Sequence, residues 1–111
     1  MGWTFVCKAD DLQDRDLRQF EVEGVPLLLA RLGDDFFAYP PLCPHQEEVL
    51  AVSGVCDGAS LTCTKHLWQW DMRTGSEIGL AEKPLLMYQV RRDGDDVSVL
   101  LEQELKYVYD D

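Results

Sequence analysis

The feature that most constrains this chain is a pair of short motifs that each hold one cysteine and one histidine. Residues 43–45 read CPH and residues 63–66 read CTKH. The chain has four cysteines and only two histidines, so both histidines fall within these motifs. A fold that uses them together must bring two separate loops to one place.

The segments around the two motifs predict short β-strands separated by turns. Asp57-Gly58 is typical of a hairpin turn, so a hairpin is expected to deliver the second motif. No stretch shows a long helical period, which favours an all-β sandwich or small barrel. The predicted strands cover residues 3–8, 17–23, 25–32, 36–39, 54–56, 60–62, 68–71, 87–92 and 97–101.

The strand predicted at residues 25–32 is almost continuously apolar. Such a pattern is expected of a strand that is buried on both faces. Pro26 must lie near its start, because proline cannot donate a hydrogen bond to a neighbouring strand.

The length of 111 residues indicates one domain. We expect a base formed by residues 1–39 and 77–111, with an insertion at 40–76 that carries both motifs. Prolines stiffen the first motif. The segment 102–111 is ambiguous: it could form a last strand or a helical turn, and its tyrosines could pack on the core or contact a partner.

The charge balance excludes some classes of partner. The formal net charge is −11, from 21 acidic and 10 basic residues, which argues against nucleic acid and anionic membranes. We find neither a signal sequence nor a membrane-spanning segment, so we expect the cytosol, where thiols stay reduced. Cysteines spaced with histidines in such a protein favour metal binding over disulfides.

Two metal centres can use two cysteines and two histidines. Zinc takes such a set in a tetrahedron, and a structural zinc domain that binds a protein partner is one interpretation. However, the commonest zinc pattern places both cysteines on one turn. A Rieske [2Fe–2S] cluster has two cysteines on one iron and two histidines on the other. Each loop must then reach both irons, which favours one such cluster per chain.

The chain resembles the Rieske ferredoxin family from near Trp3 to Leu101. The resemblance is carried by CPH at 43–45, CTKH at 63–66 and WDMRTG at 70–75. It implies an all-β fold of the Rieske type, in which a small cluster-binding β subdomain is inserted into an antiparallel β base. It also implies four cluster ligands, which are Cys43, His45, Cys63 and His66.

At two positions the chain departs from one subfamily of these ferredoxins, which narrows the subfamily that it resembles. Ferredoxins of aromatic ring-hydroxylating dioxygenases usually have glycine where this chain has Leu67, and favour glycine at the position of Glu47. The segments CPHQE and HLW are similar instead to the ferredoxins of toluene (toluene/o-xylene) monooxygenases. The dioxygenase ferredoxin remains the alternative.

The resemblance to the toluene systems implies a bacterial cytoplasmic electron carrier. It would dock transiently with an NADH-dependent flavin and iron–sulfur reductase and with a diiron hydroxylase. No nucleophile–base pair or open catalytic metal position is evident, so we expect a carrier and not an enzyme. We expect a monomer.

Residues beside the ligands suggest finer roles. Glu48 and Lys65 stand where high-potential relatives have a disulfide, so we expect a potential of about −150 mV, and the two could form an ion pair. Trp68 either shapes the docking surface and electron path or packs the second loop. By resemblance, Pro84 lies in a third loop that covers the cluster.

Three acidic residues are candidates for a docking face: Glu47, Glu48 and Asp71. They would steer basic partners toward the cluster. Cys7 and Cys56 lie outside both motifs, and we expect them to be packed free thiols.

Overall fold

A computed structural model of the chain describes residues 2–109. Its strands form three antiparallel sheets, with strand orders β1-β10-β9, β2-β3-β4 and β5-β6-β7-β8. The elements are β1 (Gly2–Lys8), η1 (Ala9–Asp11), β2 (Leu17–Val22), β3 (Val25–Leu32), β4 (Asp35–Tyr39), α1 (Leu50–Ser53), β5 (Gly54–Asp57), β6 (Ser60–Cys63), β7 (Gln69–Asp71), β8 (Glu77–Ile78), β9 (Val90–Asp93) and β10 (Asp96–Leu101).

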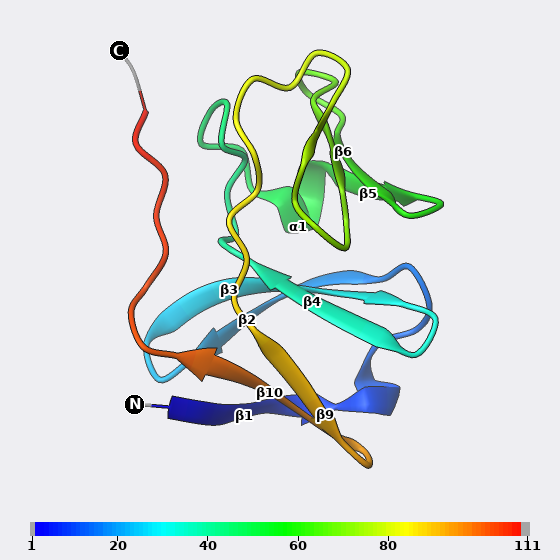
Figure 1. The fold of residues 1–111 in the computed structure, drawn as a ribbon, viewed down its shortest axis with the longest axis vertical. Helices are drawn as coiled ribbons and strands as arrows, with labels where there is room; N and C mark the ends of the chain where they lie inside the picture. Colours follow the sequence, from blue (N-terminus) through cyan, green and yellow to red (C-terminus); the bar gives the residue numbers. More distant parts are fainter. Residues whose placement is uncertain (1, 110–111) are drawn as a thin grey trace.

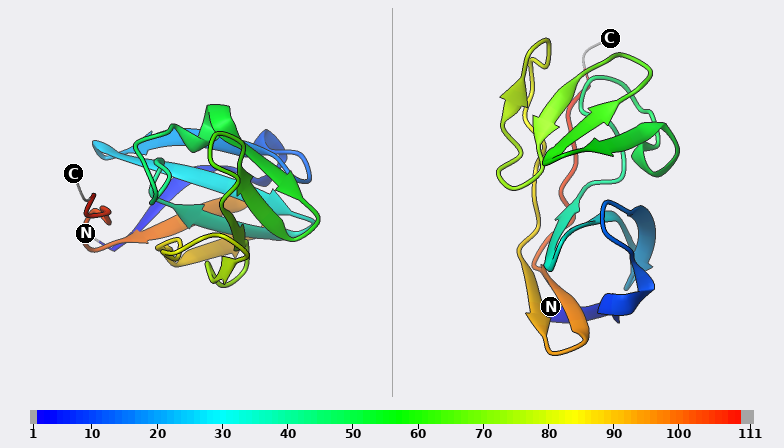
Figure 2. Two further views of the ribbon diagram at one scale, coloured as in Figure 1. Left: turned by 90° about the horizontal axis from the view of Figure 1, so that it is seen from above. Right: turned by 90° about the vertical axis from the view of Figure 1, so that its right-hand side faces the viewer.

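The two three-stranded sheets form the lower part of the molecule, and the four-stranded sheet forms the upper part (Figure 1). Seen from the side, the lower sheets curve around a common interior (Figure 2). That interior is an apolar core with buried residues from β1, β3, β4 and β10. The all-β prediction is confirmed.

Strand β3 separates two hydrophobic cores and contributes side chains to both. Leu27 and Leu29 point into the base core, whereas Leu28 and Ala30 point into a second core shared with the four-stranded sheet. All four side chains are fully buried. Alternate residues of a strand face opposite sides, so the continuous apolar run supplies both cores. The predicted burial on both faces is confirmed, with Pro26 as the second residue of the strand.

Several short elements differ from the sequence prediction. The hairpin β5–β6 turns at Asp57-Gly58 as expected. Helix α1 and strand β8 were not predicted, and β8 pairs with β7 just beyond the expected limit of residue 76. Strand β9 begins at Val90, not at 87, because Tyr88 makes only a single bridge to Ala38.

Residues 102–109 form neither of the predicted elements, a last strand or a helical turn. They follow β10 as an extended chain that runs up the side of the molecule (Figure 1). Three of their hydrogen bonds, with Leu86, Tyr88 and Cys43, each involve a tyrosine hydroxyl, and none of these three belongs to a strand ladder or a helical turn. No helix within residues 2–109 has the length and apolar character needed to span a membrane.

Candidate metal centre

The first loop joins β4 to α1 and closes on itself. The N–H of Cys43 donates to the carbonyl of Glu48 at 2.9 Å, and the N–H of Leu50 donates to the carbonyl of Pro41 at 2.9 Å. Cys43 and Pro44 are buried. The cysteine therefore sits inside a closed loop that proline stiffens.

The second loop is the tight connection between β6 and β7. The N–H of Cys63 donates to the carbonyl of Trp68, and the N–H of Leu67 donates back to the carbonyl of Cys63, both at 2.8 Å. Thr64 fastens the loop to α1, since its N–H and its hydroxyl both donate to the carbonyl of Ser53, at 2.8 and 2.7 Å.

The backbone of Leu67 is strained. Its φ of 61° lies in the left-handed region, which is costly for a residue with a side chain. Its side chain is 63% exposed, so packing gives it little in return. The second loop thus tolerates a local cost in order to close.

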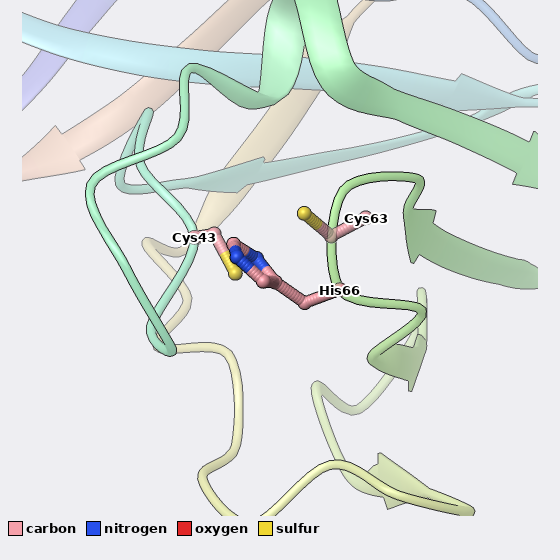
Figure 3. A group of neighbouring side chains, drawn as sticks. All are labelled: Cys43, Cys63 and His66. Atoms are coloured by element: carbon pink, nitrogen blue, oxygen red, sulfur yellow. The ribbon is translucent and has the colours of Figure 1, made fainter.

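The two loops bring the predicted ligands together. Ligand atoms of Cys43, Cys63 and His66 all lie within 4.8 Å of one another. Figure 3 shows Cys43 on one loop facing Cys63 and His66 on the other. The ring of His45 lies 4.5 Å from that of His66, measured between centroids, with the rings nearly perpendicular. Each loop therefore contributes one cysteine and one histidine to the same place.

The polar atoms of this group fit a metal cluster. The Nδ1 atoms of His45 and His66 are buried, and the described residues offer them no hydrogen-bond partner. Buried polar atoms are rarely left unpaired, and a role as metal ligands would account for both nitrogens. Both cysteines are fully buried. Two thiols and two available imidazole nitrogens are the donor set of a Rieske cluster.

Burial of Cys43 disfavours the charged form of its thiol. Burial raises the pKa of its thiol to about 11, although backbone N–H groups of Gln46 and His45 stabilise the thiolate. The N–H of His45 lies 3.4 Å from Sγ. A thiolate in such a buried place needs a positive charge beside it, and a metal supplies one.

Trp68 packs across both loops. Its ring stacks on that of His45, with centroids 4.4 Å apart and planes 18° from parallel. It is 7% exposed and belongs to the second core. It lies beside the candidate centre, as its position in the sequence suggested, and it offers little surface for docking.

The charged residues singled out near the two loops lie in different surroundings. Glu47 is exposed, as is Lys65. Glu48 accepts a hydrogen bond from the hydroxyl of Ser53 at 3.3 Å, and within residues 2–109 no ion pair joins Glu48 to Lys65. The hypothesis of that pair was wrong. Asp71 is occupied by its own turn, where it accepts from the N–H groups that follow it.

A third loop reaches the same end of the molecule. Glu82 and Lys83 line a pocket together with His45 and Trp68. The carbonyl of Lys83 accepts a hydrogen bond from the Trp70 indole at 2.8 Å. Pro84 follows Lys83 in this loop and is exposed, and its expected place over the cluster stays a prediction.

The sequence prediction missed one contact of the first loop. The hydroxyl of Tyr109 donates to the carbonyl of Cys43 at 2.8 Å. No pattern in the sequence predicts a contact between residues so far apart.

The two cysteines outside the motifs are free thiols: Cys7 is buried in the base core and Cys56 is half-buried.

Comparison with known proteins agrees with the geometry. The family model for the Rieske [2Fe-2S] domain matches residues 2–89. The methanesulfonate monooxygenase ferredoxin subunit of Methylosulfonomonas methylovora is 36% identical over 111 residues, covering 100% of this chain and 90% of that protein. The biphenyl 2,3-dioxygenase ferredoxin component of Rhodococcus jostii is 34% identical, covering 92% of this chain and 95% of that protein.

A solved structure is similar over nearly the whole chain. It is the complex of reduced oxygenase and oxidized ferredoxin in carbazole 1,9a-dioxygenase. The matching chain has a TM-score of 0.80 and 30% identity, covering 94% of this chain and 97% of that one. The three sheets and two loops described above therefore form a Rieske fold.

Proposed function

The chain belongs to the Rieske [2Fe-2S] domain family, and we propose that its cluster is bound by one cysteine and one histidine of each loop, namely Cys43, His45, Cys63 and His66. The two thiolates would hold one iron and the two imidazoles the other. The observation that carries this assignment is a pair of buried Nδ1 atoms, one on each loop, for which residues 2–109 offer no hydrogen-bond partner.

The chain is an electron-transfer component of an oxygenase system, as its relatives are named. A bound cluster supplies one-electron transfer. The protein's residues decide from which side electrons pass. Both cysteines are fully buried, whereas His45 and His66 are only half-buried. The histidine side is therefore the nearer one to an approaching partner.

We propose that the electrons come from an NADH-dependent flavin reductase and go to the diiron hydroxylase of a toluene-type monooxygenase. Leu67 and Trp68 after the second histidine support this choice, because ferredoxins of dioxygenases usually have glycine in the first of these places. The name of the methanesulfonate relative also supports a monooxygenase. The name of the biphenyl relative keeps a dioxygenase as the second candidate.

Docking would be transient and guided by charge. The net charge of −11 favours a basic patch on each partner, and the exposed Glu47 follows His45 closely in the sequence of the first loop. Transfer should then weaken as salt screens these charges. The chain would work as a monomer in the bacterial cytoplasm.

We also propose that the chain is one domain in two parts, a base and an insertion that carries the centre. The pairing of β8 with β7 supports an insertion that extends to Ile78. Strand β3, whose side chains belong to both cores, would couple the base to the insertion.

Reconstitution tests the proposed partner. The chain would be mixed with one reductase and, in turn, with the hydroxylase of a toluene monooxygenase, the oxygenase of methanesulfonate monooxygenase and a biphenyl dioxygenase. We expect the toluene enzyme to turn over fastest. Faster turnover with either other oxygenase would overturn the proposed partner. A His66→Ala chain, which cannot complete the ligand set, controls for electron flow without the ferredoxin.

A further inference from the structure

The segment 102–109 follows the last strand and lies outside the part of the chain that the family model matches. It has no helix or strand, yet it runs from the base to the upper part of the molecule, alongside the first loop (Figure 1). Figure 2 shows the same course from the side. An extended segment without a ladder needs other contacts to keep this path.

Side-chain hydrogen bonds hold the segment at intervals. They fasten it to the strand-like stretch before β9, to the third loop and to the first loop. In order along the segment, the N–H of Leu105 donates to the Tyr88 hydroxyl at 2.8 Å, the Tyr107 hydroxyl accepts from the N–H of Leu86 at 3.0 Å, the Val108 carbonyl accepts from Lys83 Nζ at 3.0 Å, and the Tyr109 hydroxyl donates to the Cys43 carbonyl at 2.8 Å.

The last of these contacts completes a pattern that both cysteines share. In the second loop, the N–H of Cys63 is bonded to Trp68, and its carbonyl accepts from the N–H of Leu67. In the first loop, the N–H of Cys43 is bonded to Glu48. Its carbonyl accepts from the side chain of Tyr109.

In the first loop, Glu47 stands to Cys43 as Leu67 stands to Cys63, but within residues 2–109 the Cys43 carbonyl accepts no backbone N–H. Pro44 has no N–H, and the N–H of Glu48 is bonded to the carbonyl of Gln46 at 2.6 Å. The N–H of His45 points to the sulfur of Cys43. The donor that Leu67 supplies locally in the second loop is therefore supplied to the first loop by Tyr109.

We propose that Tyr109 is a positioning residue for the iron–sulfur cluster and that the segment 102–109 is a strap that completes the first loop. This inference rests on the proposed role of Cys43 as a ligand. The hydroxyl fixes the peptide group next to the ligand sulfur. It also directs the positive end of its dipole toward this peptide, which favours the more negative, reduced cluster.

The test compares Tyr109→Phe with Tyr107→Phe. Both variants remove one hydroxyl from the same segment and keep the ring. Only the first removes a contact with a ligand residue, whereas the second frees the N–H of Leu86. Each loaded protein would be assayed for iron and sulfide, for the rate at which a chelator bleaches the cluster, and for its midpoint potential by voltammetry.

We expect Tyr109→Phe to lose its cluster about 2- to 10-fold faster than wild type, which corresponds to the loss of one hydrogen bond. We also expect its midpoint potential to become more negative, while that of Tyr107→Phe stays at the wild-type value. The strap is rejected if Tyr109→Phe bleaches no faster than Tyr107→Phe, or if its midpoint equals that of wild type. A wild-type chain that binds no iron and sulfide would instead reject the ligand assignment itself.

Discussion

The two cluster loops reach the same backbone arrangement by different routes. In each, the cysteine N–H donates to the carbonyl of the residue five positions later, Glu48 or Trp68. In each, the cysteine carbonyl also accepts a hydrogen bond. The donor is the neighbour Leu67 in the second loop, but it is Tyr109 in the first. The second loop thus forms both bonds locally, whereas the first forms one locally and takes the other from a distant part of the chain.

Each route has a cost. Local closure forces Leu67 into a left-handed conformation, with φ of 61°. Closure by Tyr109 avoids that strain, but it requires an otherwise irregular segment to be ordered against the molecule. A locally closed loop can form with its hairpin, whereas the first loop is complete only when the end of the described chain is in place.

The largest effect is expected where the two loops touch. Trp68 belongs to the second loop but stacks on His45 of the first. Trp68→Ala should lower the free energy of unfolding by about 3–5 kcal/mol, because it empties a buried site. Urea unfolding of the loaded protein would measure this.

The control for that variant is Trp3→Ala, since Trp3 is 40% exposed in β1, where the Arg91 guanidinium lies over its ring. This control should lower the free energy of unfolding clearly less than Trp68→Ala does. Equal losses in the two variants would mean that Trp68 does not join the loops.

The next prediction tests whether the backbone of Leu67 in the second loop is strained. Leu67→Gly and Leu80→Gly both remove an exposed leucine, and Leu80 is not among the residues with positive φ. Only the first variant relieves strain, so it should be more stable than the second by about 1–2 kcal/mol. Thermal unfolding of the pair measures the difference, and its absence would show that Leu67 is unstrained.

A smaller effect tests whether the loops are anchored independently. Thr64→Val removes the hydroxyl bond to Ser53 and should cost about 1 kcal/mol. Tyr109→Phe removes the corresponding anchor of the first loop. In the double variant, the two losses in unfolding free energy should add to within about 0.5 kcal/mol. A larger coupling would mean that the loops are held as one unit.

The smallest effect is expected from alkylation of Cys7 and Cys56, the two cysteines that lie outside both loops. Burial raises the pKa of Cys7 and of Cys56 to about 11. Because only the thiolate reacts, alkylation of the loaded protein should be slow at pH 8 and should accelerate as the pH approaches 11. Mass spectrometry and cluster absorbance would follow it. Labelling at pH 8 as fast as in denaturant would contradict this burial.

Much of this arrangement could be predicted from local patterns. The alternating and continuous apolar runs marked most strands, and Asp57-Gly58 marked the hairpin that leads to Cys63. The two Cys/His motifs marked the candidate centre, because each loop must serve both irons. Each of these signals lies within a few residues of the feature that it predicts.

The missed features depend on contacts between distant residues. Helix α1 and strand β8 are too short for a propensity signal, and β8 exists because β7 offers it a partner. The bond from Tyr109 to Cys43 joins residues 66 positions apart. A single hydroxyl donor has no periodic pattern, so the segment 102–109 could be noticed in the sequence but not placed.

The central claim is that one cysteine and one histidine of each loop bind a single cluster. Pulsed EPR spectroscopy of the chemically reduced wild-type protein tests it most directly, because it detects nitrogen nuclei bound to the iron. We predict the signal of a reduced [2Fe-2S] cluster coupled to two imidazole nitrogens, from His45 and His66. A zinc-containing protein without a signal, or an iron–sulfur signal without nitrogen coupling, would contradict the claim.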